Sequence, residues 1–213
     1  MKNLILTAVA LSSTLGAFAN SFTLDTGVDA SGNQLAPYAA EQRYAVSGNA
    51  SVATVFPPGV WPLQGGTWVN DVPGGGQWIS PSNGQAYGIT SYTLTFKSAI
   101  AQTVSLQYTG DNPARLSLNG NVVSTEAGFP VPTYSNNWFD AYTWGYWTPY
   151  TLSLQANANY VVKFDVYNGG GPAGLIVDSG LIVGTVPDGG STVVILGAGL
   201  SGLALLRRKL KTA

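Results

Sequence analysis

Apolar and polar side chains alternate with a period of two through much of the middle of the chain. In residues 92–97, Tyr92, Leu94 and Phe96 occupy every second position and polar side chains stand between them. The same alternation returns in residues 103–108, 150–155 and 160–167. Because successive side chains of a strand point to opposite faces, each segment is predicted to form a strand with one buried face and one wet face.

Short turn signals separate these segments. Asn119-Gly120 lies between the segments Leu-Ser-Leu (116–118) and Asn-Val-Val (121–123), and both residues tolerate the positive φ of a type I′ hairpin turn. Residues 155–159 are predicted to form a longer hairpin loop, and the Gly-rich residues 168–172 are predicted to end another strand. No long apolar stripe of helical period occurs between the two ends of the chain. The fold class is therefore predicted to be an all-β antiparallel β-sandwich with jelly-roll topology.

The first 19 residues have the form of a secretion signal. Lys2 supplies a positive charge, the apolar run 4–11 is too short to span a bilayer, and Ala17 and Ala19 place small side chains before a cut. Signal peptidase is expected to cleave after Ala19, which leaves residues 20–185 as one domain. A buried N-terminal helix is the alternative interpretation.

The C-terminal part of the chain has three parts in order. Residues 186–192 read Val-Pro-Asp-Gly-Gly-Ser-Thr, and the apolar run 193–206 follows them. About 18 residues from Gly189 onward are free of charge, which as a helix would span about 27 Å, close to the thickness of a hydrocarbon core. A basic cluster then follows at Arg207, Arg208, Lys209 and Lys211. We expect a transmembrane helix that holds the domain outside and the basic residues inside.

This arrangement resembles a PEP-CTERM sorting domain of the variant that begins Val-Pro-Asp. The motif consists of Val186, Pro187, Asp188, Gly189, Gly190, Ser191 and Thr192. The resemblance implies recognition by exosortase, a membrane-embedded cysteine protease-transpeptidase of Gram-negative bacteria that make exopolysaccharide. It also implies a cut near the motif and transfer of the domain from an inner-membrane intermediate to the cell envelope, the outer surface or the extracellular matrix. A simple stop-transfer anchor after a Pro-Gly linker is the alternative.

Composition excludes several classes of function. The chain contains neither Cys nor His, which removes Cys–His and Ser–His–Asp catalysis and nearly every zinc site. Residues 20–185 carry four Lys and Arg against nine Asp and Glu, a formal charge of −5. So few cations cannot neutralise a run of phosphates, and nucleic acid is not an expected partner.

The predicted domain also resembles the galactose-binding-like sandwich that often precedes PEP-CTERM tails. The resemblance covers about residues 45–180 and is carried by residues 77–80, 92–96, 111–120 and 166–175. It implies a β-sandwich, and in many such sandwiches loops at one end bind sugars.

One long segment has the composition of a sugar site. Residues 134–147 combine aromatic faces, which stack on sugar rings, with amide and carboxylate groups that bind hydroxyls. The candidate ligand-binding residues are Trp138, Asp140, Tyr142, Trp144 and Trp147. The alternative, which we favour, is that Trp138, Trp144 and Trp147 fold under and cap the sandwich.

Asp111-Asn112 is a second candidate. Its preferred interpretation is a turn in which short polar side chains bond to their own backbone. Asp111 would alternatively supply an oxygen ligand to Ca²⁺, although no EF-hand spacing supports a calcium site and no other cofactor is expected. Arg115 stands on the polar face of its predicted strand and has Asp165 and Asp178 as candidate partners. An exposed pair of this kind would add little stability.

Three functions remain open on sequence grounds. The first is a non-catalytic surface or matrix protein that binds exopolysaccharide, and the second is a purely structural sandwich without a ligand. The third, least favoured, is a glycoside hydrolase that uses two carboxylates from Glu126, Asp140, Asp165 and Asp178.

Overall fold

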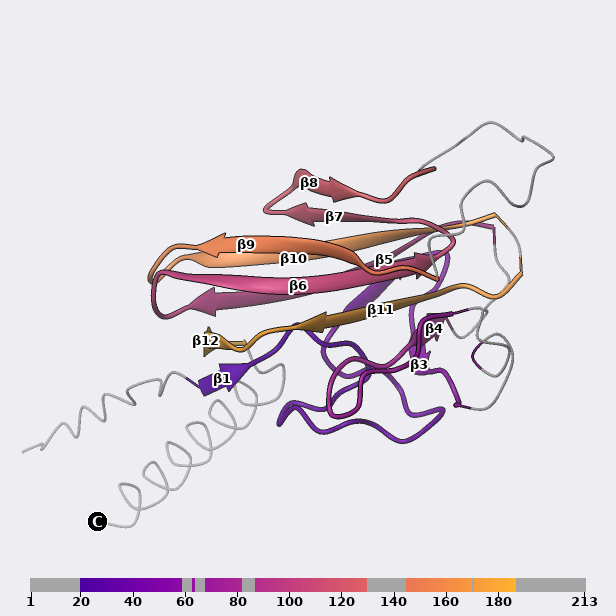
Figure 1. Cartoon of the computed structure of the whole chain (residues 1–213), viewed down its shortest axis with the longest axis horizontal. Coiled ribbons are helices and arrows are strands. Elements are labelled where there is room, and N and C mark those ends of the chain that lie inside the picture. Colours follow the sequence, from indigo (N-terminus) through magenta and orange to yellow (C-terminus); the bar gives the residue numbers. More distant parts are fainter. Residues whose placement is uncertain are drawn as a thin grey trace, which may run out of the picture.

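The computed structural model describes residues 20–58, 63, 68–81, 87–129, 145–169 and 171–186. This part of the chain contains twelve strands and no helix, and the strands form two antiparallel sheets (Figure 1). None of its elements is a helix long and apolar enough to cross a membrane. The predicted signal segment 1–19 and the tail beyond Val186 lie outside the described residues. The predicted antiparallel sandwich is confirmed.

The larger sheet has seven strands. In spatial order they are β1 (Asn20–Phe22), β12 (Ile182–Thr185), β5 (Gly88–Ser98), β10 (Asn159–Asn168), β7 (Ala114–Leu118) and β8 (Asn121–Thr125), and β2 (Ala45–Gly48) also pairs with β5. The smaller sheet has five strands in the order β3 (Ala53–Val55), β4 (Ile79–Pro81), β11 (Gly174–Ser179), β6 (Gln102–Asp111) and β9 (Thr148–Leu154).

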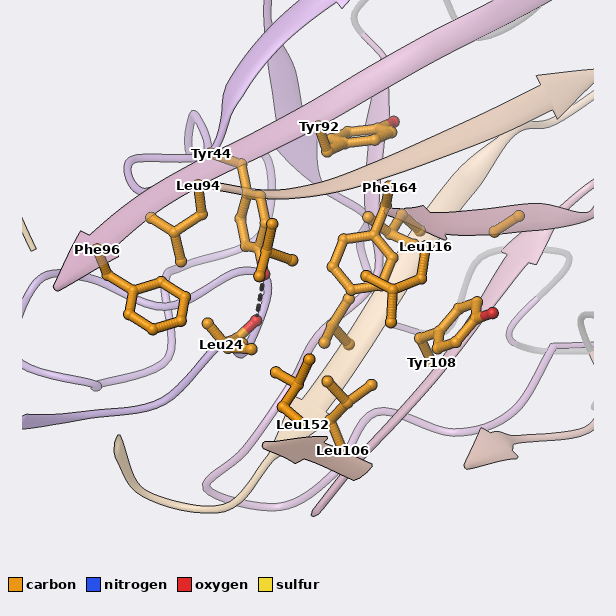
Figure 2. Close-up of a cluster of buried hydrophobic side chains, with 14 of the residues drawn as sticks. Leu24, Tyr44, Tyr92, Leu94, Phe96, Leu106, Tyr108, Leu116, Leu152 and Phe164 are labelled. Atoms are coloured by element: carbon orange, nitrogen blue, oxygen red, sulfur yellow. Dashed lines mark hydrogen bonds between the residues drawn. The ribbon is translucent and has the colours of Figure 1, made fainter. Parts of the chain in front are cut away.

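The core lies between the inner faces of the two sheets. The apolar positions of each predicted alternation point into it, and Tyr92, Leu94 and Phe96 of β5 are at most 2% exposed. Figure 2 shows these side chains packed against residues of β6, β7, β9 and β10. Tyr160, Val162, Phe164 and Val166 of β10 are buried in the same cluster. The period-two pattern therefore assigned the buried face of these central strands correctly.

The two ends of the sandwich differ. At one end, which we call the hairpin end, the turn 119–120 joins the neighbouring strands β7 and β8, and the short connections 99–101 and 155–158 lead from one sheet to the other. The predicted hairpin loop at 155–159 is wrong, because β9 pairs with β6 in the smaller sheet and β10 belongs to the larger one. In the turn between β7 and β8, Asn119 has φ 50° and Gly120 has φ 82°, which confirms the expected Asn-Gly hairpin. At the opposite end, which we call the loop end, β4, β6, β8 and β10 end and β5, β7, β9 and β11 begin.

The N-terminal segment closes the fold against the last strands. The backbone N–H of Thr26 donates to the carbonyl of Val177, and the Thr26 hydroxyl accepts from the N–H of Val177. Two residues earlier, the N–H of Leu24 donates to Ser179 Oγ at 2.7 Å. Residues 24–26 thus bond to residues of β11, which stand about 150 residues later in the chain.

Candidate functional site

A second apolar cluster lies on the outer face of the smaller sheet, separate from the main core. It consists of Leu63, Trp68, Trp78 and Ile176, with Phe56, Val69 and Trp147 packed against it, and we call it the tryptophan cluster. The rings of Trp68 and Trp78 stack with centroids 4.1 Å apart at 27°. Ile176 points outward because its neighbours on β11, Leu175 and Val177, fill the main core.

Asp111 is bound to this cluster at the end of β6. Trp68 Nε1 donates to Asp111 Oδ2 at 2.6 Å, and Asp111 is 7% exposed. Burial raises the pKa of the Asp111 carboxyl to about 7, and the hydrogen bond from Trp68 limits the rise. Trp78 Nε1 donates to the carbonyl of Val69 at 2.8 Å, so both indole N–H groups have acceptors.

Asn112 connects the same end of the sandwich to the larger sheet. Its backbone N–H donates to the carbonyl of Tyr167 at 3.0 Å, and its Oδ1 accepts from the N–H of Gly169 at 2.8 Å. The side chains of Asp111 and Asn112 therefore bond to groups far along the chain, and the predicted bonding to their own backbone is wrong. Within the described residues, no group of three or more His, Cys, Asp or Glu is placed to hold a metal ion.

Glu126 fills the loop end between the two sheets. Its Oε2 accepts from the N–H groups of Ala114 at 2.6 Å and Gly110 at 3.3 Å, and its Oε1 accepts from Thr148 Oγ1 at 3.1 Å. Only 3% of Glu126 is exposed. Burial raises the pKa of this carboxyl to about 7, against the lowering effect of the hydrogen bonds it accepts. Glu126 thereby joins the end of β6 and the start of β7 to the first residue of β9.

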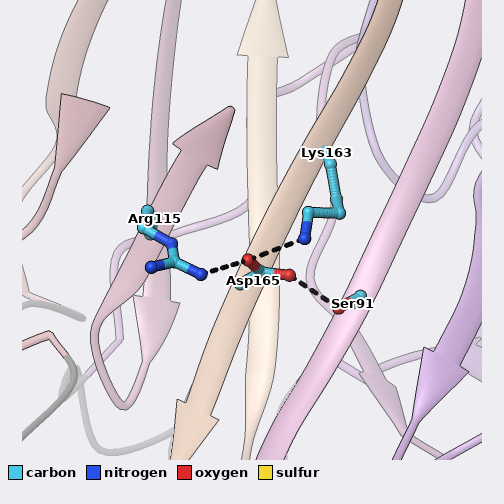
Figure 3. A network of polar contacts seen from close by, with 4 residues as sticks. All are labelled: Ser91, Arg115, Lys163 and Asp165. Atoms are coloured by element: carbon cyan, nitrogen blue, oxygen red, sulfur yellow. Dashed lines mark hydrogen bonds and ion pairs between the residues drawn. The ribbon is translucent and has the colours of Figure 1, made fainter. Parts of the chain in front are cut away.

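Asp165 forms a charged network on the outer face of the larger sheet (Figure 3). Its Oδ2 lies 2.8 Å from Arg115 Nη2 and 3.0 Å from Lys163 Nζ, and Ser91 Oγ donates to its Oδ1 at 2.6 Å. Burial raises the pKa of Asp165, but the bonds from Ser91, Arg115 and Lys163 outweigh it and hold the pKa below its usual value. Of the two candidate partners of Arg115, the structure pairs it with Asp165, whose side chain is 3% exposed. The Arg115 guanidinium also lies 4.7 Å from the ring centroid of Phe129.

Three of the seven candidate ligand-binding residues lie in the described part of the chain. Trp147 is half-buried against the tryptophan cluster, and Asp111 is bonded to Trp68 of the same cluster. Asn112 follows Asp111 directly at the loop end. The structure therefore brings together two candidates, Asp111 and Trp147, that stand far apart in the sequence. The remaining four, Trp138, Asp140, Tyr142 and Trp144, lie outside the described residues.

The predicted processing sites fall mostly outside the described residues. Val186 is half-buried and packs against the main core. The rest of the sorting motif, from Pro187, lies outside the described part. So do the basic residues Arg207, Arg208, Lys209 and Lys211, and the predicted cleavage residues Ala17 and Ala19.

Sequence reasoning missed the tryptophan cluster, although one signal was present. Leu175, Ile176 and Val177 are three consecutive apolar residues, a pattern typical of a strand buried on both faces. That pattern indicates that something covers the outer face of β11. Trp68 and Trp78 provide the cover.

The chain was compared with known proteins. No curated protein sequence matches it. Among solved structures, a β-glucosidase from Kluyveromyces marxianus in complex with glucose is 12% identical with a TM-score of 0.32, and the match covers 53% of this chain and 11% of the enzyme. This chain thus spans about a ninth of the enzyme's length.

Two carbohydrate-binding modules are also similar in structure. A variant of a family 29 module is 12% identical with a TM-score of 0.36, over 79% of this chain and 93% of the module. A family 61 module in complex with β-1,4-galactotriose is 12% identical with a TM-score of 0.37, over 66% of this chain and 88% of the module. Likenesses at this level are not a basis for assigning a ligand.

The C-terminal region has a family match of its own. The VPDSG-CTERM motif matches residues 185–210, which begin at the last residue of β12. A sorting motif of this kind implies an exported protein. The region that follows the sandwich therefore carries a VPDSG-CTERM sorting motif, as the resemblance to PEP-CTERM tails predicted.

Proposed function

We propose that this protein is a substrate of exosortase, sorted to the cell envelope or extracellular matrix of a Gram-negative bacterium. The observation that carries the proposal is the VPDSG-CTERM match, which starts where the sandwich ends. In this scheme the chain is first anchored in the inner membrane by residues 193–206. Exosortase then cuts near the motif and transfers the domain.

Sorting is tested in a host that contains an exosortase. Pro187→Ala and Asp188→Ala are expected to prevent processing, because Pro187 restricts the backbone and Asp188 supplies the motif's charge. Lys211→Arg, which keeps the positive charge outside the motif, is the matched control. The measurements are the intact mass and the cellular location of the mature protein. Unchanged mass and location in both motif variants would reject the exosortase mechanism.

We further propose that the loop end binds polysaccharide without catalysis. The support is local: Trp147 lies half-buried at the margin of the tryptophan cluster, and the adjacent Tyr146 is 75% exposed. Flat aromatic faces at a surface stack on the C–H face of sugar rings. The buried Asp111 holds Trp68 beneath this margin and fixes its position.

Binding is tested by retention of the protein on released exopolysaccharide. Tyr146→Ala and Trp147→Ala are expected to reduce retention several-fold. Leu181→Ala is the matched control, because Leu181 is 66% exposed and stands away from the loop end, just before β12. If the native protein is retained no better than an unrelated β-sandwich, the domain is a structural sandwich without a sugar ligand.

Non-catalytic binding is favoured over hydrolysis by the state of the described carboxylates. Glu126 and Asp165 each accept several internal hydrogen bonds, and Asp178 Oδ2 accepts from Gln107 Nε2 at 3.1 Å. A glycoside hydrolase needs two carboxyl groups that face the scissile bond. Release of shorter sugars from the polysaccharide, lost in Glu126→Gln, would instead establish the hydrolase.

A further inference from the structure

Positive charge is concentrated on one sheet of the sandwich. Of the four Lys and Arg in residues 20–185, three stand in strands of the larger sheet: Lys97 in β5, Arg115 in β7 and Lys163 in β10. The strands of the smaller sheet contain no Lys or Arg and carry two acids, Asp111 and Asp178. Residues 20–185 have a formal charge of −5 in all, so the larger sheet differs in sign from the domain as a whole.

The three cations lie on the outer face of the larger sheet. Lys97 follows the buried Phe96 on β5 and is exposed, because successive side chains of a strand point to opposite faces. The side chains of Lys163 and Arg115 are 39% and 30% exposed, and both bond to Asp165 (Figure 3). Asp165 is the single acid in the seven strands of this sheet. Three cations against one carboxylate give the outer face a formal charge of +2.

The face between the cations is open and carries hydroxyl groups. Lys163 stands opposite Thr93, which is four residues from Lys97 along β5, so the two Lys positions are about 14 Å apart along the strand. Thr95 lies between them on the same face and stands opposite Val161. Thr95 is exposed and Val161 is 39% exposed. No segment within the described ranges therefore covers this part of the face.

An aromatic side chain lies on the same face, toward the loop end. Tyr167 follows Asp165 two residues later on β10 and stands opposite Ile89 of β5, which is 36% exposed. From Lys97 to Ile89 the strand advances by eight residues, about 27 Å. Cations, hydroxyl groups and an aromatic ring thus follow one another along the face. These groups bind the charges, the hydroxyls and the C–H faces of an acidic sugar chain.

Arg115 keeps hydrogen-bond donors that the described residues do not use. Its Nη2 donates to Asp165, and its Nε is buried and has no acceptor in the described part of the chain. A buried donor without an acceptor costs free energy. An anionic oxygen that draws the guanidinium outward would accept from this donor and recover that free energy.

We propose that the outer face of the larger sheet binds an acidic polysaccharide, with Lys97, Lys163 and Arg115 bound to its carboxylate groups. Charge complementarity supports this occupant, because the face attracts anions and the rest of the acidic domain repels them. Cations this few and this widely spaced suit a sugar chain with carboxylates on separate sugars. They do not suit nucleic acid, whose phosphates repeat about every 3.4 Å along a strand. The site is separate from the aromatic margin at the loop end and does not depend on sugar binding there.

The test compares two substitutions that change the net charge equally. Thr95→Asp places a carboxylate between the cations of the face, and Ser153→Asp places one at an exposed position of β9 in the smaller sheet. Lys97→Gln removes one cation and keeps the test valid if Thr95→Asp disturbs the sheet. The probes are polygalacturonate and its uncharged methyl ester. The affinity is measured by isothermal titration calorimetry at low salt, with the full chain in a non-ionic detergent.

Cations outside the domain are removed from every protein compared. The reference chain therefore carries five background substitutions, which prevent the two ends of the sequence from binding the polymer: Lys2→Gln, Arg207→Gln, Arg208→Gln, Lys209→Gln and Lys211→Gln. This chain is expected to bind polygalacturonate and not the methyl ester, and added salt is expected to weaken the binding. Equal affinity for both polymers would overturn the role of the carboxylates.

The variants locate the binding surface. Thr95→Asp and Lys97→Gln are expected to weaken binding several-fold, and Ser153→Asp is expected to leave it unchanged. Equal losses in Thr95→Asp and Ser153→Asp would show an effect of net charge alone and would overturn the site. Loss in Tyr146→Ala together with full binding in Thr95→Asp would place the acidic polymer at the loop end and would also overturn it.

Anionic lipid is the competing ligand for a cationic face. Phosphatidylglycerol vesicles are therefore titrated in parallel, with phosphatidylcholine vesicles as the uncharged reference. Binding to phosphatidylglycerol that Thr95→Asp abolishes, without binding to polygalacturonate, would make the lipid headgroup the ligand and would overturn the inference. Binding to polygalacturonate that is stronger than binding to either vesicle is the expected result.

Discussion

The buried carboxyl of Glu126 makes the stability of the domain depend on pH in a defined direction. Its pKa rises from 4.5 to about 7 on folding, so between these values the folded state binds a proton that the unfolded state has lost. The contribution of Glu126 to the free energy of unfolding is fully present below pH 4.5 and is lost as the pH rises through about 7. The free energy of unfolding that is lost in this way is about 3 kcal/mol, because each tenfold step in proton affinity is worth about 1.4 kcal/mol.

Glu126→Gln removes the titration and keeps the shape. One amide oxygen is able to accept from Ala114 and Gly110 as Oε2 does, and the amide NH₂ is able to donate to Thr148 Oγ1. Near pH 5 the variant is expected to be about as stable as the native domain. Near pH 8 it is expected to be about 2–3 kcal/mol more stable, because it has no charge to bury.

The assay is urea unfolding of residues 20–186 followed by tryptophan fluorescence at both pH values. Asp111 titrates in both proteins, so its contribution cancels in the comparison. Glu126→Ala is the contrasting variant: it leaves the N–H groups of Ala114 and Gly110 without this acceptor and should cost about 2–5 kcal/mol at either pH. A difference between native and Glu126→Gln that is the same at pH 5 and pH 8 would show that Glu126 is ionised throughout.

Further variants test other parts of the fold by the same unfolding assay. In Gly76→Ala the new methyl group would overlap the carbonyl oxygen of Val177, so the free energy of unfolding is expected to fall by at least about 2 kcal/mol. Gly180→Ala is the control: the atom nearest to its new methyl group is 3.6 Å away, and the fall should stay below about 1 kcal/mol. Asp165→Asn is expected to lower the free energy of unfolding by about 1–3 kcal/mol near pH 7. Because the stability that comes from a lowered carboxyl pKa disappears in acid, a similar loss at pH 3 would contradict a role for the charge of Asp165. Trp68→Phe keeps an aromatic ring but removes the N–H that donates to the buried carboxyl of Asp111, so the free energy of unfolding is expected to fall by about 1–3 kcal/mol. An unchanged free energy of unfolding would mean that this hydrogen bond adds no stability.

The sequence predicted the central strands and one hairpin because the physical causes are local. Tyr92, Leu94 and Phe96 are buried on one face because side chains alternate along any strand, and Asn119-Gly120 turns because both residues accept positive φ. These features require no knowledge of distant partners. The pairing of Arg115 with Asp165 was also foreseen, since both stand on polar faces of neighbouring strands.

The site was predicted less completely because its contacts join distant parts of the chain. Trp68 meets Asp111 across 43 residues, and Trp147 joins the same cluster from a third segment. Periodicity carries no information on such encounters. It also could not show that Glu126 is enclosed by backbone N–H groups rather than free to act on a substrate, because that depends on how the two sheets close at the loop end.

The bonds of residues 24–26 to β11 have a consequence for how the domain folds. Leu24 and Asp25 find their partners at Ser179, about 155 residues further along, so the first part of the domain depends on nearly the last. Contacts of such high sequence separation form slowly, because the closure of a long loop must precede them. The polypeptide therefore cannot complete its native structure until its final strands have been made.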